Sequence, residues 1–245
     1  MKILYWLRSA LIMIVIPVSM IVLGTSVMVC HILFRNKKID DWHIATWGKI
    51  NYQAFGVNLK VFGHENLPKG GCLFLFNHSS FFDIFAICGA IPGVRFGAKA
   101  ELFKIPIFAQ AMRMMGTLPI ARQSREEVYK VYDEAKERLK IQSFALSPEG
   151  GRFYGPQLSP FKAGPFIFAM SAEALIVPVV ILGAYECLPK GNIIPNKDKA
   201  SRTIEVHILK AISSVGYQTS TRQKLQAEVY AAMNPLWVNY QNQDA

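Results

Sequence analysis

The chain has 245 residues, of which 51% are hydrophobic, and it carries a net charge of +10 at pH 7. This length suits one large domain, or one domain with an accessory segment, and the apolar content is high for a water-soluble protein. The positive charge favours an acidic partner such as anionic lipid, nucleic acid or an acidic protein. Four cysteines without a CxxC spacing exclude the usual zinc signatures.

The first predicted element is an apolar helix. Residues 9–34 contain no Asp, Glu, Lys or Arg, and as a helix they would cross a bilayer core of about 30 Å. A cleaved signal peptide is the alternative, but the apolar run is too long for a signal core and no Ala-x-Ala site follows. We therefore expect a retained membrane anchor over residues 1–38. Pro17 and Gly24 could bend this anchor into a re-entrant hairpin instead of a straight span.

An amphipathic segment follows the anchor, over residues 39–56. Trp42 and Trp47 lie among polar residues at helical spacing. Tryptophans directly after an anchor suit the lipid headgroup level, but a helix packed on the domain core would have the same pattern. Both interpretations stay open, and the segment links the anchor to a domain over residues 57–245.

Strands and helices alternate through the rest of the chain. The predicted strands are residues 57–63, 72–76, 94–98, 117–120, 143–146, 175–182 and 203–209, and the predicted helices are residues 81–90, 105–115, 124–140, 161–172 and 219–233. This order predicts an α/β fold, with a largely parallel sheet covered by helices.

The first polar signal is His78 followed five residues later by Asp83. It lies where a buried strand gives way to a helix. Five residues turn an ideal helix by about 500°, so the two side chains can meet only if His78 lies in the connecting loop. Asp83 could then orient His78 as a general base. Alternatively, Ser80 to Asp83 forms a capping box that only bonds the Ser80 amide.

Two more polar stretches follow predicted strands, where open α/β sheets bind ligands. Arg122 ends one of them and could bind a phosphate, or it could be a solvated residue before the next helix. The other runs from Glu149 through Gly150 and Gly151 to Arg152. Its glycines allow close approach to a ligand, although a plain turn with a surface ion pair has the same residues.

Several other functions are excluded by missing motifs. The chain has no GxxxxGK[ST] loop, no GxGxxG and no GxSxG elbow. It also lacks RNA-binding aromatic signatures, and an apolar N-terminal anchor is not typical of a nucleic-acid-binding protein. We therefore expect no nucleic-acid partner.

Taken together, these stretches resemble the 1-acyl-sn-glycerol-3-phosphate (lysophosphatidic acid) acyltransferase family of glycerolipid acyltransferases. That family is marked by His-x4-Asp, Gly-x-x-Phe-x-x-Arg, Pro-Glu-Gly-Thr-Arg and an apolar block containing Pro. The matching residues are His78 and Asp83, Gly116 and Arg122, Pro148, Glu149, Gly150 and Arg152, and Val177-Pro178-Val179. Lys99 falls at a basic position of the family's phosphate pocket. The resemblance covers about residues 55–185.

Three departures from the family pattern concern the acceptor side of the site. Pro119 stands where the second block usually has Phe, Ala121 where an acidic or polar residue is common, and Gly151 where the third block has Thr. They leave open an O-acyltransferase for another lysolipid, such as a lyso-ornithine lipid or lysophospholipid, or an inactive membrane lipid-binding relative.

The resemblance implies acyl transfer from acyl-CoA or acyl-[acyl carrier protein] to the sn-2 hydroxyl of 1-acyl-glycerol-3-phosphate, giving phosphatidic acid. His78 would be the base and Asp83 its orienting acid, with oxyanion donors among the amides of residues 79–81. The acceptor phosphate would be bound by Lys99, Arg122 and Arg152. Glu149, beside Gly150, would bind a glycerol hydroxyl or Arg152.

The resemblance implies no metal, and no cofactor apart from the acyl-CoA or acyl carrier protein that serves as co-substrate. The expected partners are membrane lipids, a lysophospholipid acceptor and acyl-CoA or the acidic carrier protein, and we expect a monomer. The expected location is the membrane, and in a bacterium the inner membrane with the active site on its cytoplasmic face.

Overall fold

The computed structural model describes residues 2–243. Its strands are β1 (Val57–Phe62), β2 (Cys72–Phe76), β3 (Arg95–Lys99), β4 (Leu118–Ile120), β5 (Phe144–Leu146), β6 (Leu175–Leu182), β7 (Arg202–Ile208) and β8 (Ile212–Ser213). Its helices are α1 (Lys2–Ile12), α2 (Val15–Phe34), α3 (Lys37–Ala54), α4 (Phe82–Ala90), α5 (Phe108–Met114), α6 (Arg125–Leu139), α7 (Gly164–Ser171), α8 (Ala184–Cys187) and α9 (Arg222–Gln243), with the 3-10 turns η1 (His64–Asn66) and η2 (Ala100–Lys104).

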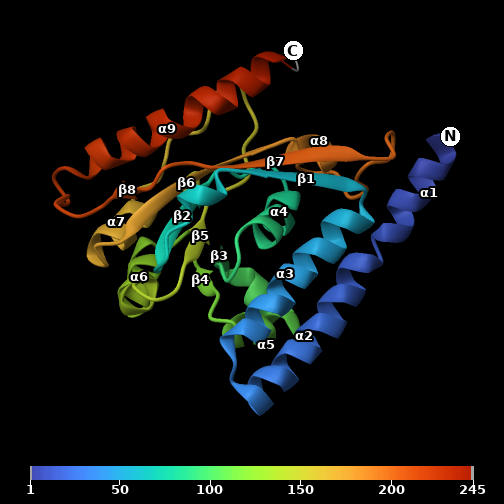
Figure 1. Cartoon of the computed structure of the whole chain (residues 1–245), viewed down its shortest axis with the longest axis horizontal. Coiled ribbons are helices and arrows are strands. Elements are labelled where there is room, and N and C mark those ends of the chain that lie inside the picture. Colours follow the sequence, from blue (N-terminus) through green and yellow to red (C-terminus); the bar gives the residue numbers. More distant parts are fainter. Residues whose placement is uncertain (1, 244–245) are drawn as a thin grey trace.

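All eight of these strands form one sheet, with helices on both of its faces (Figure 1). The strand order is β1-β7-β6-β2-β5-β3-β4, and β8 pairs with β6. Every pairing is parallel except those of β6 with β7 and with β8. The prediction of a largely parallel, helix-covered sheet is therefore confirmed. Because β2, β5, β3 and β4 are parallel, the residues that follow them meet at one edge of the sheet.

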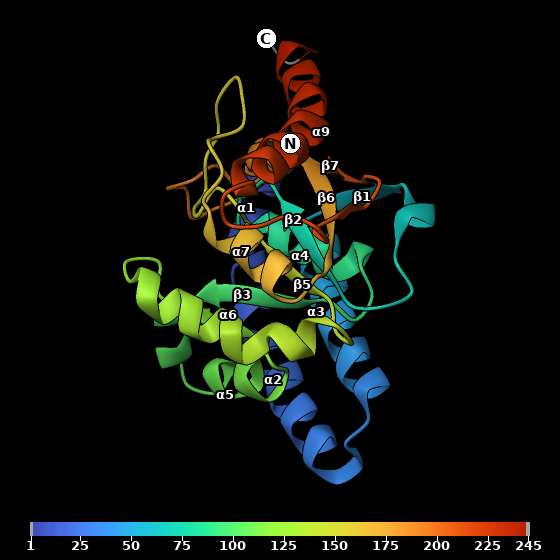
Figure 2. The same cartoon turned by 90° about the vertical axis from the view of Figure 1, so that its left-hand side faces the viewer.

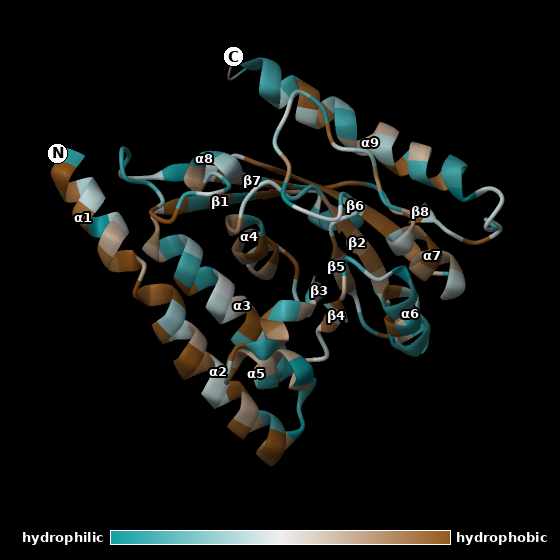
Figure 3. Ribbon diagram, turned by 180° about the vertical axis from the view of Figure 1, so that it is seen from behind, coloured by the Kyte–Doolittle hydropathy of each residue, from teal (hydrophilic) through white to brown (hydrophobic). Residues whose placement is uncertain are grey.

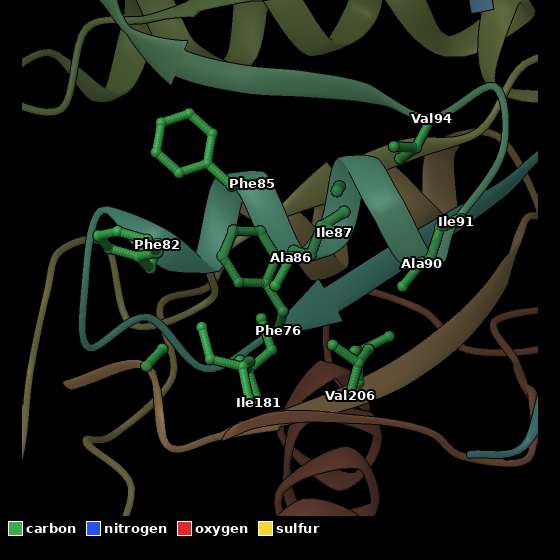
Figure 4. Packing of buried hydrophobic residues seen from close by; sticks show 14 of the residues in the cluster. Phe76, Phe82, Phe85, Ala86, Ile87, Ala90, Ile91, Val94, Ile181 and Val206 are labelled. Atoms are coloured by element: carbon green, nitrogen blue, oxygen red, sulfur yellow. The ribbon is translucent and has the colours of Figure 1, made fainter. Parts of the chain in front are cut away.

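The central strand β2 separates two hydrophobic cores. Its side chains alternate, so Phe74 and Phe76 enter one core while Leu73 and Leu75 enter the other. The first core lies under α4 and includes Phe76, Phe82 and Ile181 (Figure 4). The second core lies under α6, α7 and α9. Burial on both faces explains why β2 is a continuous apolar run.

The N-terminal helices form a hairpin against the first face of the sheet. A break at residues 13–14 separates α1 from α2, because Pro17 has no N–H to donate to the Met13 carbonyl. From there α2 runs through Gly24 without interruption, and the chain reverses at Arg35, which adopts a left-handed conformation. The reversal therefore comes after the apolar helix, and α3 forms the returning arm.

Three polar contacts join α2 to α3 along the hairpin. They are Asn51 Nδ2 to Ser19 Oγ (3.0 Å), Ser26 Oγ with His43 Nε2 (2.9 Å) and His31 Nδ1 with Asp40 Oδ2 (2.9 Å). On its other side α3 packs against α4, where Trp47 lies against Phe85 with 4.9 Å between ring centroids. The hairpin is thus attached to the domain through α3, as expected for a helix packed on the core, while Trp42 is 58% exposed.

The outer face of α1 and α2 is apolar and exposed (Figure 3). Its exposed residues are Ile3, Leu4, Leu7, Leu11, Ile14, Val18, Ile21, Val22, Val29, Ile32 and Leu33. Their spacing of three to four residues places them along one side of the helix. By length and composition, residues 2–34 are the one stretch of the described chain that could cross a membrane.

The structure corrects several predicted boundaries. The last helix was expected to end at residue 233, before Pro235, but α9 continues to Gln243. Beyond the proline, Trp237 is buried and its indole N–H donates to the Gly155 carbonyl at 2.9 Å, which holds this part of the helix on the domain. The short elements α8 and β8 were not predicted, because their sequences are too short to show a period.

The contact between α3 and α4 generates a stability prediction. A Cβ added at Gly48 would lie 2.4 Å from Cys88 Cβ and 2.8 Å from the Phe85 carbonyl oxygen. Gly48→Ala should therefore lower the free energy of unfolding by about 1–3 kcal/mol, although Ala favours a helix. Thermal unfolding of the detergent-solubilised protein measures the change. Gly70→Ala is the control, because its new Cβ meets nothing within 4 Å; equal melting temperatures for both variants would contradict this packing.

Candidate active site

The His78 and Asp83 side chains meet at the end of β2. His78 lies in the loop before α4, and its Nδ1 is 2.8 Å from Asp83 Oδ2. The same oxygen accepts the backbone N–H groups of Ser79 and Ser80, each at 2.8 Å. The capping contact to Ser80 and the pairing with His78, which are alternatives on spacing alone, are both present.

This arrangement selects one form of the histidine ring. Because a carboxylate oxygen accepts from Nδ1, that nitrogen carries the proton and Nε2 of the neutral ring keeps a free lone pair. Asp83 is fully buried, whereas the His78 side chain is 12% exposed. His78 also lines a large cavity. The ring is therefore oriented to accept a proton from a ligand in that cavity.

Asn77 fixes the start of this loop, a contribution that the motif search missed. Its side chain pairs with the backbone of Ile181 in β6, accepting from the N–H at 2.7 Å and donating to the carbonyl at 2.9 Å. Asn77 thereby extends the β2–β6 ladder by one residue after β2 ends. The expectation of oxyanion donors at residues 79–81 is corrected in part, since Asp83 already occupies two of these three amides.

Basic residues lie at the same edge of the sheet. Lys99, Arg122 and Gly150 line the cavity together with His78. Arg152 is not among the lining residues, but it lies close enough to Arg122 to act on it. Burial lowers the pKa of the Arg122 guanidinium, nearby Glu101 raises it and Arg152 lowers it further. The structure thus brings two predicted phosphate-binding cations into the cavity and places the third beside it.

Glu149 has a different environment from the one expected. Its Oε1 accepts the His78 N–H at 2.8 Å and its Oε2 accepts the Ser159 N–H at 3.1 Å. Among the described residues it forms no ion pair with Arg152, and it faces a separate cavity of about 70 Å³ beside Trp237. Both carboxylate oxygens are therefore engaged in holding the loops, and we assign Glu149 a positioning role for His78.

The large cavity has a volume of about 850 Å³. One part, the inner arm, runs from His78 between α2, α3 and α5. It is lined mainly by apolar side chains, among them Met20, Leu23, Val27, Phe108 and Met112. A volume of this size is in the range of about 300–1,000 Å³ common for small-molecule sites. The shape suits a long apolar group whose reactive end lies at His78.

Comparisons with known proteins agree with these features. The family model described as Acyltransferase matches residues 58–182. The 1-acyl-sn-glycerol-3-phosphate acyltransferase of Saccharomyces cerevisiae is 33% identical over 192 residues, which are 74% of this chain and 61% of that protein. The protein of the same name from Escherichia coli is 30% identical over 175 residues, which are 64% of this chain and 68% of that protein.

A solved structure confirms the fold. The crystal structure of the 1-acyl-sn-glycerophosphate (LPA) acyltransferase PlsC from Thermotoga maritima superposes with a TM-score of 0.78 at 24% identity, covering 94% of this chain and 95% of that one. The chain therefore belongs to the acyltransferase family, in its 1-acyl-sn-glycerol-3-phosphate acyltransferase branch. It spans 56% of the length of the chloroplastic BAT2 relative of Brassica napus, which is 30% identical over 194 residues.

Glu149 generates a prediction on pH dependence. Burial raises its pKa from 4.5 to about 7, although the His78 and Ser159 amides lower it. The folded protein thus binds a proton that the unfolded chain has released, so this group's contribution to stability falls as pH rises from about 4.5 to about 7. Over that interval the free energy of unfolding of the wild-type protein should fall by about 3 kcal/mol more than that of Glu149→Gln. Denaturant unfolding at several pH values measures the difference.

The control for this prediction is Glu134→Gln, at an exposed position of α6. It should follow the wild-type pH profile. Parallel profiles for wild type and Glu149→Gln would show that Glu149 is not the titrating group.

Proposed function

We propose that this protein transfers an acyl group from a thioester donor, acyl-CoA or acyl-[acyl carrier protein], to the sn-2 hydroxyl of 1-acyl-glycerol-3-phosphate. The observation that carries the proposal is the 2.8 Å contact between His78 Nδ1 and Asp83 Oδ2 at one end of the large cavity. Family membership supports the reaction class, and the cavity supports a long-chain substrate. The product would be phosphatidic acid.

The chemistry follows from the protonation state of His78. Its free Nε2 takes the proton from the acceptor hydroxyl as the oxygen attacks the thioester carbonyl, and Asp83 stabilises the imidazolium that forms. The tetrahedral intermediate then collapses, the C–S bond breaks, and the departing thiolate takes up the proton that His78 holds. No protein nucleophile is needed in this scheme, because a thiolate is already a good leaving group.

The two substrates have different requirements, and the cavity offers a place for each. The donor's acyl chain fits the inner arm, where it would be removed from water by α2, α3 and α5. The acceptor phosphate fits beside Lys99 and Arg122, and Arg152 adds positive charge near Arg122. In this scheme no metal takes part, and the carrier of the acyl group is a co-substrate.

The acceptor's headgroup depends on the residues that depart from the family pattern. A Cβ added at Gly151, where the family has Thr, would lie 3.9 Å from Arg122 Nη1. The glycine therefore leaves space beside the guanidinium that a threonine would fill. A lyso-ornithine lipid or another lysophospholipid remains an alternative acceptor for the same catalytic pair.

The activity test compares variants of the catalytic pair. His78→Ala should abolish transfer, a loss of at least about 10²–10³-fold, because the base is removed. Asp83→Asn should also be strongly impaired, since the ring would lose its orienting acceptor. Mass spectrometry of the lipids formed from a panel of lysolipids with both donors measures the rates. Near-normal turnover by His78→Ala, with its folding checked by thermal unfolding, would refute the mechanism.

We further propose that α1 and α2 lie in the plane of the membrane surface and do not span the bilayer. The inner face of α2 binds polar groups of α3 through Ser19, Ser26 and His31. A spanning α2 would therefore carry these groups of α3 into the hydrocarbon, which is costly. The exposed apolar outer face matches a helix that buries one side only.

Membrane depth measurements test this orientation. Spin labels at Leu7→Cys, Val18→Cys and Val29→Cys, in a background lacking Cys30, should report similar shallow depths in anionic vesicles. A label at Lys130→Cys, which is exposed on α6, should stay in water and is the control. A steady change of depth through the bilayer centre from residue 7 to residue 29 would show that the helix spans.

A further inference from the structure

The large cavity has a second part, the outer arm, which leads away from the catalytic pair between α6 and the start of α7. One face of α6 lines it through Arg125, Val128, Tyr129 and Tyr132. The opposite wall is close, since a Cβ added at Gly164 would lie 3.4 Å from the Tyr132 ring and 3.8 Å from a Val128 methyl. None of these residues belongs to the four family motifs.

Three cations line the outer arm from three separate parts of the chain. Arg125 begins α6, Lys162 precedes α7 by two residues, and Arg222 begins α9. Lys162 lies next to the reaction site, because a Cβ added at Gly150 would lie 3.3 Å from its Cγ. Each cation thus lies at or near a helix N-terminus, where backbone N–H groups add further positive potential.

Side-chain hydrogen bonds tie Arg222 to the segment before α7. Arg222 Nε donates to Gln226 Oε1 at 3.0 Å, and Gln226 Nε2 donates to the Phe161 carbonyl at 3.1 Å. The start of α9 and the start of α7 are therefore fixed relative to one another. The guanidinium is held at the cavity by its neighbours and is not a freely mobile surface group.

The three cations lack acidic partners. In the part of the chain that the structure describes, none of them forms an ion pair. Lys136 of α6 pairs with Asp133 at 2.7 Å, and Lys140, directly after α6, pairs with Glu137 at 2.9 Å. Three uncompensated charges around one arm are suited to a ligand with several anionic groups.

Tyr132 adds a polar group to the outer arm. The residue is only 4% exposed and lines the cavity, yet its hydroxyl makes none of the hydrogen bonds found within residues 2–243. The hydroxyl is therefore available to form a hydrogen bond with a ligand in the cavity. One turn earlier, Tyr129 is 39% exposed and offers an aromatic face beside Arg125.

The outer arm is on the side of the molecule away from the exposed face of α1 and α2. In Figure 1 these two helices lie on the right and α6 and α7 lie on the left, and Figure 2, seen from that left-hand side, has α6 and α7 in front. A ligand of this arm would therefore approach from water and not from the proposed membrane surface. The inner arm extends the other way, toward α2.

We propose that the outer arm binds the adenosine 3′,5′-bisphosphate end of acyl-CoA. Coenzyme A carries a pyrophosphate, a 3′-phosphate and a purine, which match three unpaired cations and an exposed tyrosine ring. The single phosphodiester of an acyl carrier protein would leave most of these groups unused. The acceptor phosphate does not require them, since Lys99 and Arg122 are two further cations of the cavity. This inference rests on the proposed acyl transfer and identifies the carrier of its donor.

The first test measures binding without turnover. Adenosine 3′,5′-bisphosphate is titrated by calorimetry into the full-length protein in nanodiscs. Arg125→Gln, Lys162→Gln and Arg222→Gln should each weaken binding about tenfold, the effect of losing one charge-assisted hydrogen bond. Lys130→Gln and Lys224→Gln, at exposed positions of α6 and α9, are matched controls and should bind as wild type does. Absence of binding to wild type, or equal losses in the controls, would overturn the proposal.

The second test is kinetic. The same three variants should raise the KM for acyl-CoA about tenfold, with no change in the KM for the lysolipid. With acyl-N-acetylcysteamine, a thioester without phosphate groups, variants and wild type should be equal. A raised lysolipid KM would instead place the cations on the acceptor side. If the variants impaired only the reaction with acyl-[acyl carrier protein] and not the reaction with acyl-CoA, the nucleotide assignment would be overturned. The wild-type protein could also bind the nucleotide but acylate no lysolipid. This result would refute the proposed acyl transfer and would still support the nucleotide site.

Discussion

The geometry of the candidate site depends on one carboxylate oxygen, Asp83 Oδ2. It accepts three N–H groups, from the His78 ring and from the amides of Ser79 and Ser80, in a wholly buried position. A buried carboxylate is stable only when such donors surround it. The oxygen that orients the His78 ring therefore also holds the backbone of the loop that carries it.

The same loop is held from two other sides, and these contacts position it against the sheet. Asn77 bonds the backbone of β6, and Glu149, from the loop after β5, bonds the His78 amide. Both strands that pair with β2 thus help to hold the loop, β6 through its backbone and β5 through the loop that follows it. As a result the base is fixed in the wall of a cavity that has both apolar and cationic lining residues. A substrate with an apolar chain and a charged carrier would place its reactive carbon near this base.

The sequence predicts those features that depend on short spacing. The His78–Asp83 contact and the buried strand at residues 72–76 are both expected from local pattern, and the structure has them. The role of Glu149 could not be predicted, because it depends on which strand lies beside β2. The cations of the outer arm could not be predicted for the same reason, because they come from three segments that are far apart in the sequence and meet only in the folded chain. Contacts between residues close in the sequence can be predicted from it, whereas contacts between distant segments cannot.

The polar contacts of the α2–α3 hairpin have a consequence for biogenesis. They join residues at most 32 positions apart, and every one of them precedes β1 in the chain. Such contacts close quickly and require no part of the sheet. During synthesis the hairpin can therefore assemble while the remaining residues are still being added, and it hides its serine, histidine and aspartate groups between the two helices. The nascent chain would then meet lipid with an apolar surface already prepared, and the catalytic domain would complete its folding beside the membrane that holds its acceptor.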